Sequence, residues 1–158
     1  MKRSFVFSIV AFIAIAILAA YVSAHREADE KDKFTKHFTG SIFRITENGE
    51  FSIELIPDEK EYKIGKDVIG IVVHDKHDGD VENADIEISY EGMSESPIIK
   101  EKGEGLYIIK KLDLKREGHW SFQMTIKKRK VIDKATFAFP DDLNKTLPAG
   151  RYSKEDLK

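Results

Sequence analysis

Hydrophobic and polar residues alternate with a period of two along much of the chain after residue 50. In the first such stretch, FSIELI, apolar residues occupy positions 51, 53 and 55, and Pro57 ends the run. This period places apolar side chains on one face of a half-buried β-strand. The stretches that alternate in this way, or that are short, apolar and bounded by turn residues, are 51–56, 67–74, 84–90, 97–102, 106–114, 120–127 and 130–139.

The spacing of these stretches predicts an all-β fold. About seven short strands in some 90 residues, joined by residues that favour turns, are typical of an immunoglobulin-like β-sandwich. Long stretches with the 3.6-residue period of a helix are missing from this region, which argues against an α/β fold and its phosphate-binding loops. We therefore expect one immunoglobulin-like β-sandwich over residues 50–139, preceded by an N-terminal signal or anchor helix.

The segments that flank residues 50–139 are more polar. Residues 25–49 begin with HREADEKDK and are typical of a polar tether, within which 38–45 is a candidate edge strand. Residues 140–158 carry a second proline at Pro148 and few large apolar side chains. This composition predicts a flexible C-terminal tail.

The first 24 residues have the pattern of a targeting segment. Lys2 and Arg3 precede an apolar run over residues 5–22, and the small or apolar residues at 22–24 suit signal peptidase. Cleavage after Ala24 is one prediction. The alternative is an uncleaved membrane anchor, because about 18 residues of helix span about 27 Å, close to the hydrocarbon thickness of a bilayer. Both alternatives place the rest of the chain outside the cytoplasm, either in the periplasm or anchored to the cytoplasmic membrane and facing outwards.

Charge and cysteine content narrow the classes of function. Residues 1–24 contain two of the 26 Lys and Arg and none of the 28 Asp and Glu, so the remainder has 24 basic against 28 acidic residues and a net charge of −4. Binding to phosphate backbones requires a basic surface, so we expect no nucleic acid partner. The chain has no cysteine, which excludes disulfides, thiolate metal sites and a cysteine nucleophile.

Two longer stretches carry a recognisable pattern. In FSIELIPDEKEYKIGKDVIGIVVHDKHDGDVENADIEISYEGM, an apolar strand that follows a glycine runs into an aspartate, a turn glycine and an alanine. In GEGLYIIKKLDLKREGHWSFQMTIKK, a glycine–tyrosine strand is followed by a glycine–tryptophan strand. The residues at the positions of the pattern are Gly65, Asp75, Gly79, Val81, Ala84, Gly105, Tyr107, Gly118 and Trp120. Over residues 50–139 the chain resembles the FixH/YtkA-like family of exported domains.

This resemblance implies a small immunoglobulin-like β-sandwich outside the cytoplasmic membrane. Some members of the family are implicated in the assembly of membrane copper oxidases or in heavy-metal handling, often with one N-terminal membrane helix. Members that are linked to metal often carry methionine-rich stretches after the third strand. The corresponding stretch here, SYEGMSESP, keeps a single methionine, Met93, and departs from that pattern.

The stretch HDKHDGD at 74–80 is the strongest candidate for metal chemistry. Neutral imidazoles of His74 and His77 could bind Cu(II) or Zn(II), with an oxygen ligand from Asp75, Asp78 or Asp80. The alternative is a solvated turn between two strands, because Asp and Gly tolerate the dihedral angles of turns. The sequence favours the turn and keeps the metal site as the alternative.

Two further residues are candidate ligands. His119 on a later strand could join the His74–His77 turn, although an exposed strand histidine is the simpler interpretation. Met93 lies in a serine-rich loop and could offer a soft sulfur to Cu(I), whereas a lone exposed methionine needs no such role. We therefore expect no cofactor, with copper or zinc as the alternative.

The sequence shows no catalytic pattern. Its serines lack a nucleophile elbow, and its carboxylates are scattered among lysines as on a solvated surface, so we expect no enzymatic activity. The preferred interpretation is an extracytoplasmic binding or assembly module whose partner is an envelope or membrane protein. The family resemblance links it to respiratory-oxidase assembly or heavy-metal homeostasis, and residues 5–22 associate it with the membrane if they are retained. The alternative is a copper or zinc carrier that uses the histidines of the 74–80 turn.

Overall fold

A computed structural model describes residues 33–56, 68–112, 119–139, 141–142 and 147–157. The signal or anchor segment that the sequence predicts at 1–24 lies outside these residues. Within the described ranges, no helix is long and apolar enough to cross a membrane.

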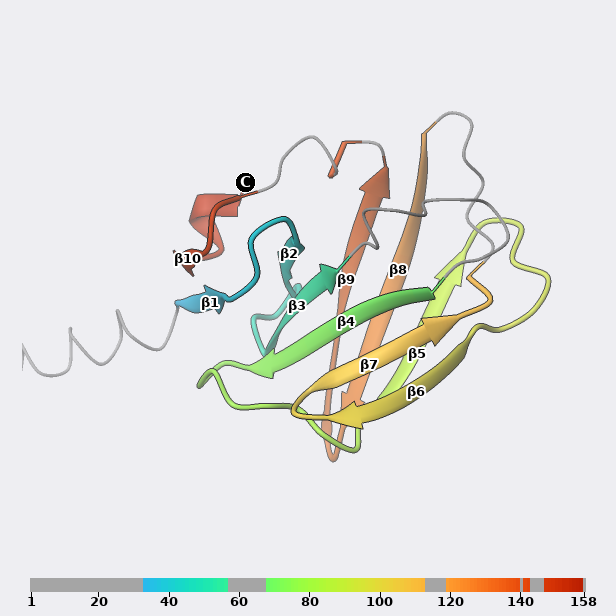
Figure 1. The fold of residues 1–158 in the computed structure, drawn as a ribbon, viewed down its shortest axis with the longest axis horizontal. Helices are drawn as coiled ribbons and strands as arrows, with labels where there is room; N and C mark the ends of the chain where they lie inside the picture. Colours follow the sequence, from blue (N-terminus) through green and yellow to red (C-terminus); the bar gives the residue numbers. More distant parts are fainter. Residues whose placement is uncertain (1–32, 57–67, 113–118, 140, 143–146, 158) are drawn as a thin grey trace, which may run out of the picture. The chain divides into compact units, whose positions relative to one another are not determined.

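Ten strands and one 3-10 helix make up the described part of the chain. They are β1 (Phe34–Lys36), β2 (Ile42–Ile45), β3 (Phe51–Ile56), β4 (Val68–Asp75), β5 (Asp85–Tyr90), β6 (Ile98–Gly103), β7 (Leu106–Lys110), β8 (Trp120–Lys128), β9 (Val131–Phe139), β10 (Gly150–Tyr152) and η2 (Glu155–Leu157). Figure 1 shows β4, β7 and β6 in one layer, in front of β5, β8 and β9 in a second layer.

The order of the strands is that of an immunoglobulin-like sandwich. One antiparallel sheet has the order β2-β3-β4-β7-β6, and the other has the order β5-β8-β9. If β3 to β9 are lettered A to G, these sheets read A-B-E-D and C-F-G, which is the constant-type immunoglobulin arrangement. The predicted all-β sandwich of seven strands over residues 50–139 is therefore confirmed, with β2 added at the edge next to β3.

The apolar core lies between the two sheets, where the period-two pattern places it. Ile53 on β3 pairs in register with Val73 on β4, and both are completely buried. Met124 on β8 belongs to the same buried cluster, and Trp120 stacks on Phe139 with ring centroids 4.2 Å apart. Burial of these apolar side chains supplies the main driving force for folding, since disulfides are absent.

The flanks of the sandwich contain structure that the sequence analysis did not predict. A polar tether was expected at 25–49 and a flexible tail at 140–158, but β1 pairs with β10 in an antiparallel ribbon, with Phe34 opposite Tyr152. The candidate edge strand at 38–45 appears as the shorter β2. Strands β1 and β10 have only three residues each, which is too short for a periodic pattern to be recognised. Each of them also depends on the other, more than 100 positions away along the chain.

Residues 33–41, which we call the covering segment, lie against the outer face of β3. Ser52 and Glu54 alternate with the core residues of β3, so the pattern alone predicts that they face solvent. They are only 1% and 0% exposed. The covering segment covers Glu54, to which it donates hydrogen bonds from residues 37, 38 and 41. Strand β3 is thus buried on both faces, one apolar and one polar.

The loop between β4 and β5 is held in place by residues at the start of β7. The Tyr107 hydroxyl donates a hydrogen bond to the Val81 carbonyl at 2.7 Å and accepts one from the Ala84 amide at 3.1 Å. The Gly105 carbonyl accepts from the Val73 amide at 3.0 Å, and Gly105 has a φ of +68°. A Cβ at Gly105 would lie 2.6 Å from the Val73 carbonyl oxygen, so this close approach requires glycine.

Substitution of this glycine tests the close approach. Gly105→Ala should lower the free energy of unfolding by roughly 1–3 kcal/mol, because it combines a left-handed backbone with a backbone clash. Gly70→Ala on β4 is the matched control, since its Cβ would meet only side chains at 3.8–3.9 Å. Urea unfolding measures the free energy of unfolding of both variants. Equal values for Gly105→Ala and Gly70→Ala would contradict the need for glycine at position 105.

Asp133 on β9 ties the loop after β2 to the second sheet. Its carboxylate accepts hydrogen bonds from the amides of Asn48, Glu50 and Lys134 at 2.9–3.2 Å. Burial by itself raises the pKa of Asp133, but hydrogen bonds from Thr46 and from these three amides together outweigh it and hold the pKa below its ordinary value.

The depressed pKa of Asp133 predicts a pH-dependent stabilisation. Its contribution should be complete above the unfolded-state pKa of about 3.9 and should be lost as the pH falls through the lower folded-state pKa. The difference in unfolding free energy between the native chain and Asp133→Asn should therefore be largest near neutral pH and should shrink in acid. Urea unfolding at several pH values measures it, with the exposed Asp141→Asn as control. A difference that stays constant with pH would contradict this account.

Candidate metal centre

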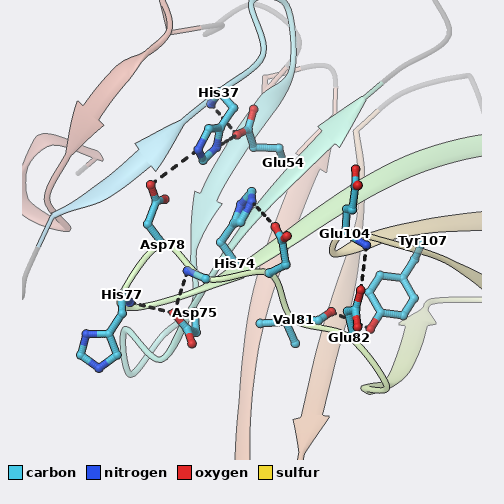
Figure 2. Close-up of polar contacts among 12 residues, drawn as sticks. His37, Glu54, His74, Asp75, His77, Asp78, Val81, Glu82, Glu104 and Tyr107 are labelled. Carbon is cyan, nitrogen blue, oxygen red and sulfur yellow. Dashed lines mark hydrogen bonds and ion pairs between the residues drawn. The ribbon is translucent and has the colours of Figure 1, made fainter.

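A cluster of two histidines and a glutamate lies on the outer face of the larger sheet. Glu54 on β3 and His74 on β4 project from neighbouring strands, and the covering segment brings His37 over them. One ligand atom from each of the three residues lies within 4.8 Å of the others. Figure 2 shows the two imidazoles close together, with the Glu54 carboxylate beside His37.

Glu54 is the most buried member of this cluster. Its Oε1 accepts hydrogen bonds from the His37 amide at 2.5 Å and from His37 Nδ1 at 3.0 Å. Its Oε2 accepts from the Phe38 amide at 2.9 Å and from the Ser41 hydroxyl at 2.7 Å. These four donors replace water around a carboxylate that is 0% exposed, which lets the charge stay buried.

His74 has one ring nitrogen with a partner and one without. Its Nε2 lies 3.2 Å from Asp80 Oδ1, while its buried Nδ1 has no hydrogen-bond partner. The ring of His74 lies 4.4 Å from the ring of His37, measured between centroids. A buried polar atom without a partner is uncommon in folded proteins, and a bound ion is one of its explanations.

Both ring nitrogens of His37 face carboxylates. Nδ1 contacts Glu54, and Nε2 lies 3.6 Å from Asp78 Oδ2. Without an ion, Nδ1 carries the proton that it donates to Glu54. With an ion bound, the proton would belong on Nε2 beside Asp78, which frees the Nδ1 lone pair next to Glu54 Oε1. The same logic for His74 places its proton on Nε2 beside Asp80 and leaves the lone pair on Nδ1. A carboxylate behind each imidazole is the usual arrangement of histidines that bind metal.

The HDKHDGD stretch forms a turn that places aspartates, and not His77, beside the cluster. Asp75 Oδ1 accepts hydrogen bonds from the amides of His77 and Gly79, so this carboxylate shapes the turn. Asp78 adopts a left-handed conformation with a φ of 64°. Figure 2 shows Asp78 directed at His37, whereas the exposed His77 points away from it. The turn therefore supplies Asp78 and Asp80 rather than a second histidine.

The structure does not bring the other predicted ligands to His74. His77 is exposed in the turn, and the side chain of His119 is 80% exposed, with Asp141 at 4.0 Å as its charged neighbour. Met93 is partly buried in the loop after β5, where its amide donates to the Tyr90 carbonyl. His37 and Glu54 could not be recognised as candidate ligands from the sequence, because only its burial beneath the covering segment distinguishes Glu54 from other strand glutamates.

The charges around the cluster favour a cation. Glu54, Asp78 and Asp80 surround the two imidazoles, and Lys36 is the nearby basic residue. Burial lowers the pKa of the Lys36 ammonium group, and the negative charge of Glu54 counteracts part of this effect. With neutral imidazoles and a charged lysine, three carboxylates leave a local excess of two negative charges. A divalent ion would neutralise this excess.

The donor atoms select a class of metal. Imidazole nitrogens with carboxylate oxygens suit Zn(II) and Cu(II). Cu(I) prefers sulfur, and Ca(II) prefers a shell of oxygens, so neither matches two imidazoles in a buried site. The residues present therefore fit a borderline divalent transition-metal ion.

No protein family, curated protein or solved structure matches the chain. The resemblance to the FixH/YtkA-like family therefore stays a prediction, and the function has to be inferred from the chemistry of the cluster.

Removal of the buried carboxylate should destabilise the protein even without metal. Glu54→Ala leaves four donors without an acceptor and Lys36 without its nearby negative charge, so the free energy of unfolding should fall by about 3 kcal/mol or more. Glu87→Ala is the matched control on β5, because Glu87 is exposed and pairs with Lys127 at the surface. Its cost should stay below about 1 kcal/mol. Urea unfolding in EDTA measures both, and similar losses would contradict the anchoring role of Glu54.

Proposed function

We propose that this chain is an extracytoplasmic, non-enzymatic module that binds one Zn(II) or Cu(II) ion through His37, Glu54 and His74. The observation that carries the proposal is the buried Nδ1 of His74, which has no hydrogen-bond partner and belongs to a cluster of three ligand groups within 4.8 Å.

The burial of the ligands favours holding an ion over catalysis. Glu54 and His74 lie under the covering segment, and the side chain of His37 is the most exposed of the three at 34%. A catalytic metal keeps an open coordination position for water or substrate, whereas a stored or structural ion is enclosed. Burial of two of the three ligands also favours slow release, which suits a protein that stores metal.

Two features of the sequence support a setting for this activity. The apolar run at 5–22 supports export, and the resemblance to FixH/YtkA-like domains supports a role near respiratory-oxidase assembly or heavy-metal homeostasis. In this setting the partner is an envelope or membrane protein that supplies or receives the ion.

Calorimetric titration of the full chain in detergent micelles, after removal of metal with EDTA, tests the proposal. We expect one Zn(II) or Cu(II) ion to bind per chain with a submicromolar Kd, on the order expected for an enclosed site. His74→Ala should weaken binding by about 100-fold or more, because it removes a ligand, whereas loss of an outer-shell partner costs 10–100-fold.

His77→Ala is the matched control, since His77 lies in the same stretch but is exposed. It should bind metal as tightly as the native chain. Binding that survives His74→Ala, or that His77→Ala abolishes, would place the ion elsewhere and overturn the proposed site. Circular dichroism of each variant separates lost binding from lost folding.

A further inference from the structure

The candidate metal centre joins segments that lie far apart along the chain. Glu54 and His74 belong to the sandwich, and Asp78 belongs to the turn after β4. His37 belongs to the covering segment, whose strand β1 forms a separate two-stranded sheet with β10. An ion bound to His37 and His74 would therefore fasten the covering segment to the sandwich.

The surface buried beneath the covering segment is unusually polar. Besides Glu54 and His74 on the sandwich, the contact buries Lys36 of the segment itself, which is 1% exposed. Ser52, on the same face of β3 as Glu54, is also 1% exposed, and its hydroxyl has no hydrogen-bond partner. Closure of the segment removes water from an ammonium group, a carboxylate and an imidazole. Hydrogen bonds and charge attraction repay this desolvation only in part, so a contact of this kind adds little net stability.

The hydrogen bonds that hold the segment on β3 converge on one side chain. The amides of His37 and Phe38 and the hydroxyl of Ser41 all donate to Glu54. The ammonium group of Lys36 donates to the Leu147 carbonyl, which lies outside the sandwich strands. Since one buried carboxylate holds this stretch of backbone, the segment can open locally while the apolar core of the sandwich stays intact.

We propose that the bound ion acts as a latch, so that metal occupancy sets how firmly the covering segment is docked on the sandwich. This inference rests on the proposed function, because it concerns the same ion. In the closed state His37 lies over His74, and both can bind the ion. In the open state the two ligands are apart, and the ion does not bind. Binding therefore shifts the equilibrium towards closure by the factor 1 + [metal]/Kd.

Hydrogen exchange of the full chain in detergent micelles, with EDTA or with Zn(II), tests the latch. The amides of His37 and Phe38 report its opening, because both donate to Glu54 in the closed state. Without metal they should exchange faster than the amides of β8, the central strand of the smaller sheet. At a free Zn(II) concentration of 100 times Kd, their exchange should slow by about 100-fold. His77→Ala should respond in the same way, whereas His74→Ala should lose the response.

The outcomes separate this inference from the proposed function. Zn(II) binding by calorimetry without slower exchange at His37 and Phe38 would overturn the latch and leave metal binding standing. Exchange of these amides that is as slow as that of β8 without metal would also overturn it, because the segment would then open only with global unfolding. Failure of Zn(II) to bind at all would overturn both proposals.

Discussion

The buried carboxylate of Glu54 is the constraint on which the arrangement around it depends. A carboxylate removed from water needs donors in place of the solvent, and here the backbone of the covering segment provides most of them. This requirement fixes the covering segment against β3 and sets the ring of His37 over that of His74. One strand thus has two roles: its inner face builds the apolar core, and its outer face organises a polar centre.

The sandwich could be predicted from the sequence because each of its strands can be recognised from its own residues. A period of two, or a short apolar run between turn residues, marks the strands β3 to β9, and their count and spacing are sufficient to predict an immunoglobulin-like fold. The cluster could not be predicted in the same way. His37, Glu54 and His74 come from three separate segments, and their proximity depends on strand register and on a segment whose strand, β1, is only three residues long.

The HDKHDGD stretch shows how far the spacing of residues can mislead. Two histidines three positions apart look like a ligand pair, but His74 still belongs to β4 and points towards the covering segment, while His77 lies in the exposed turn. Asp75 has the structural role in this turn, through its hydrogen bonds to the backbone. The stretch is therefore a turn, and it also places His74, Asp78 and Asp80 at the cluster.

The β1–β10 ribbon brings the two ends of the described chain together. Phe34 lies directly opposite Tyr152, so a gap of only about 5 Å separates the two strands. A short peptide bridge across this gap would close the chain, and new ends could be opened at the exposed β8–β9 hairpin around Arg129. Such a circular permutant would keep every strand pairing and the His37–Glu54–His74 cluster. The ribbon thus makes the domain suitable for insertion into another protein, because its ends can be joined to neighbouring positions of a host.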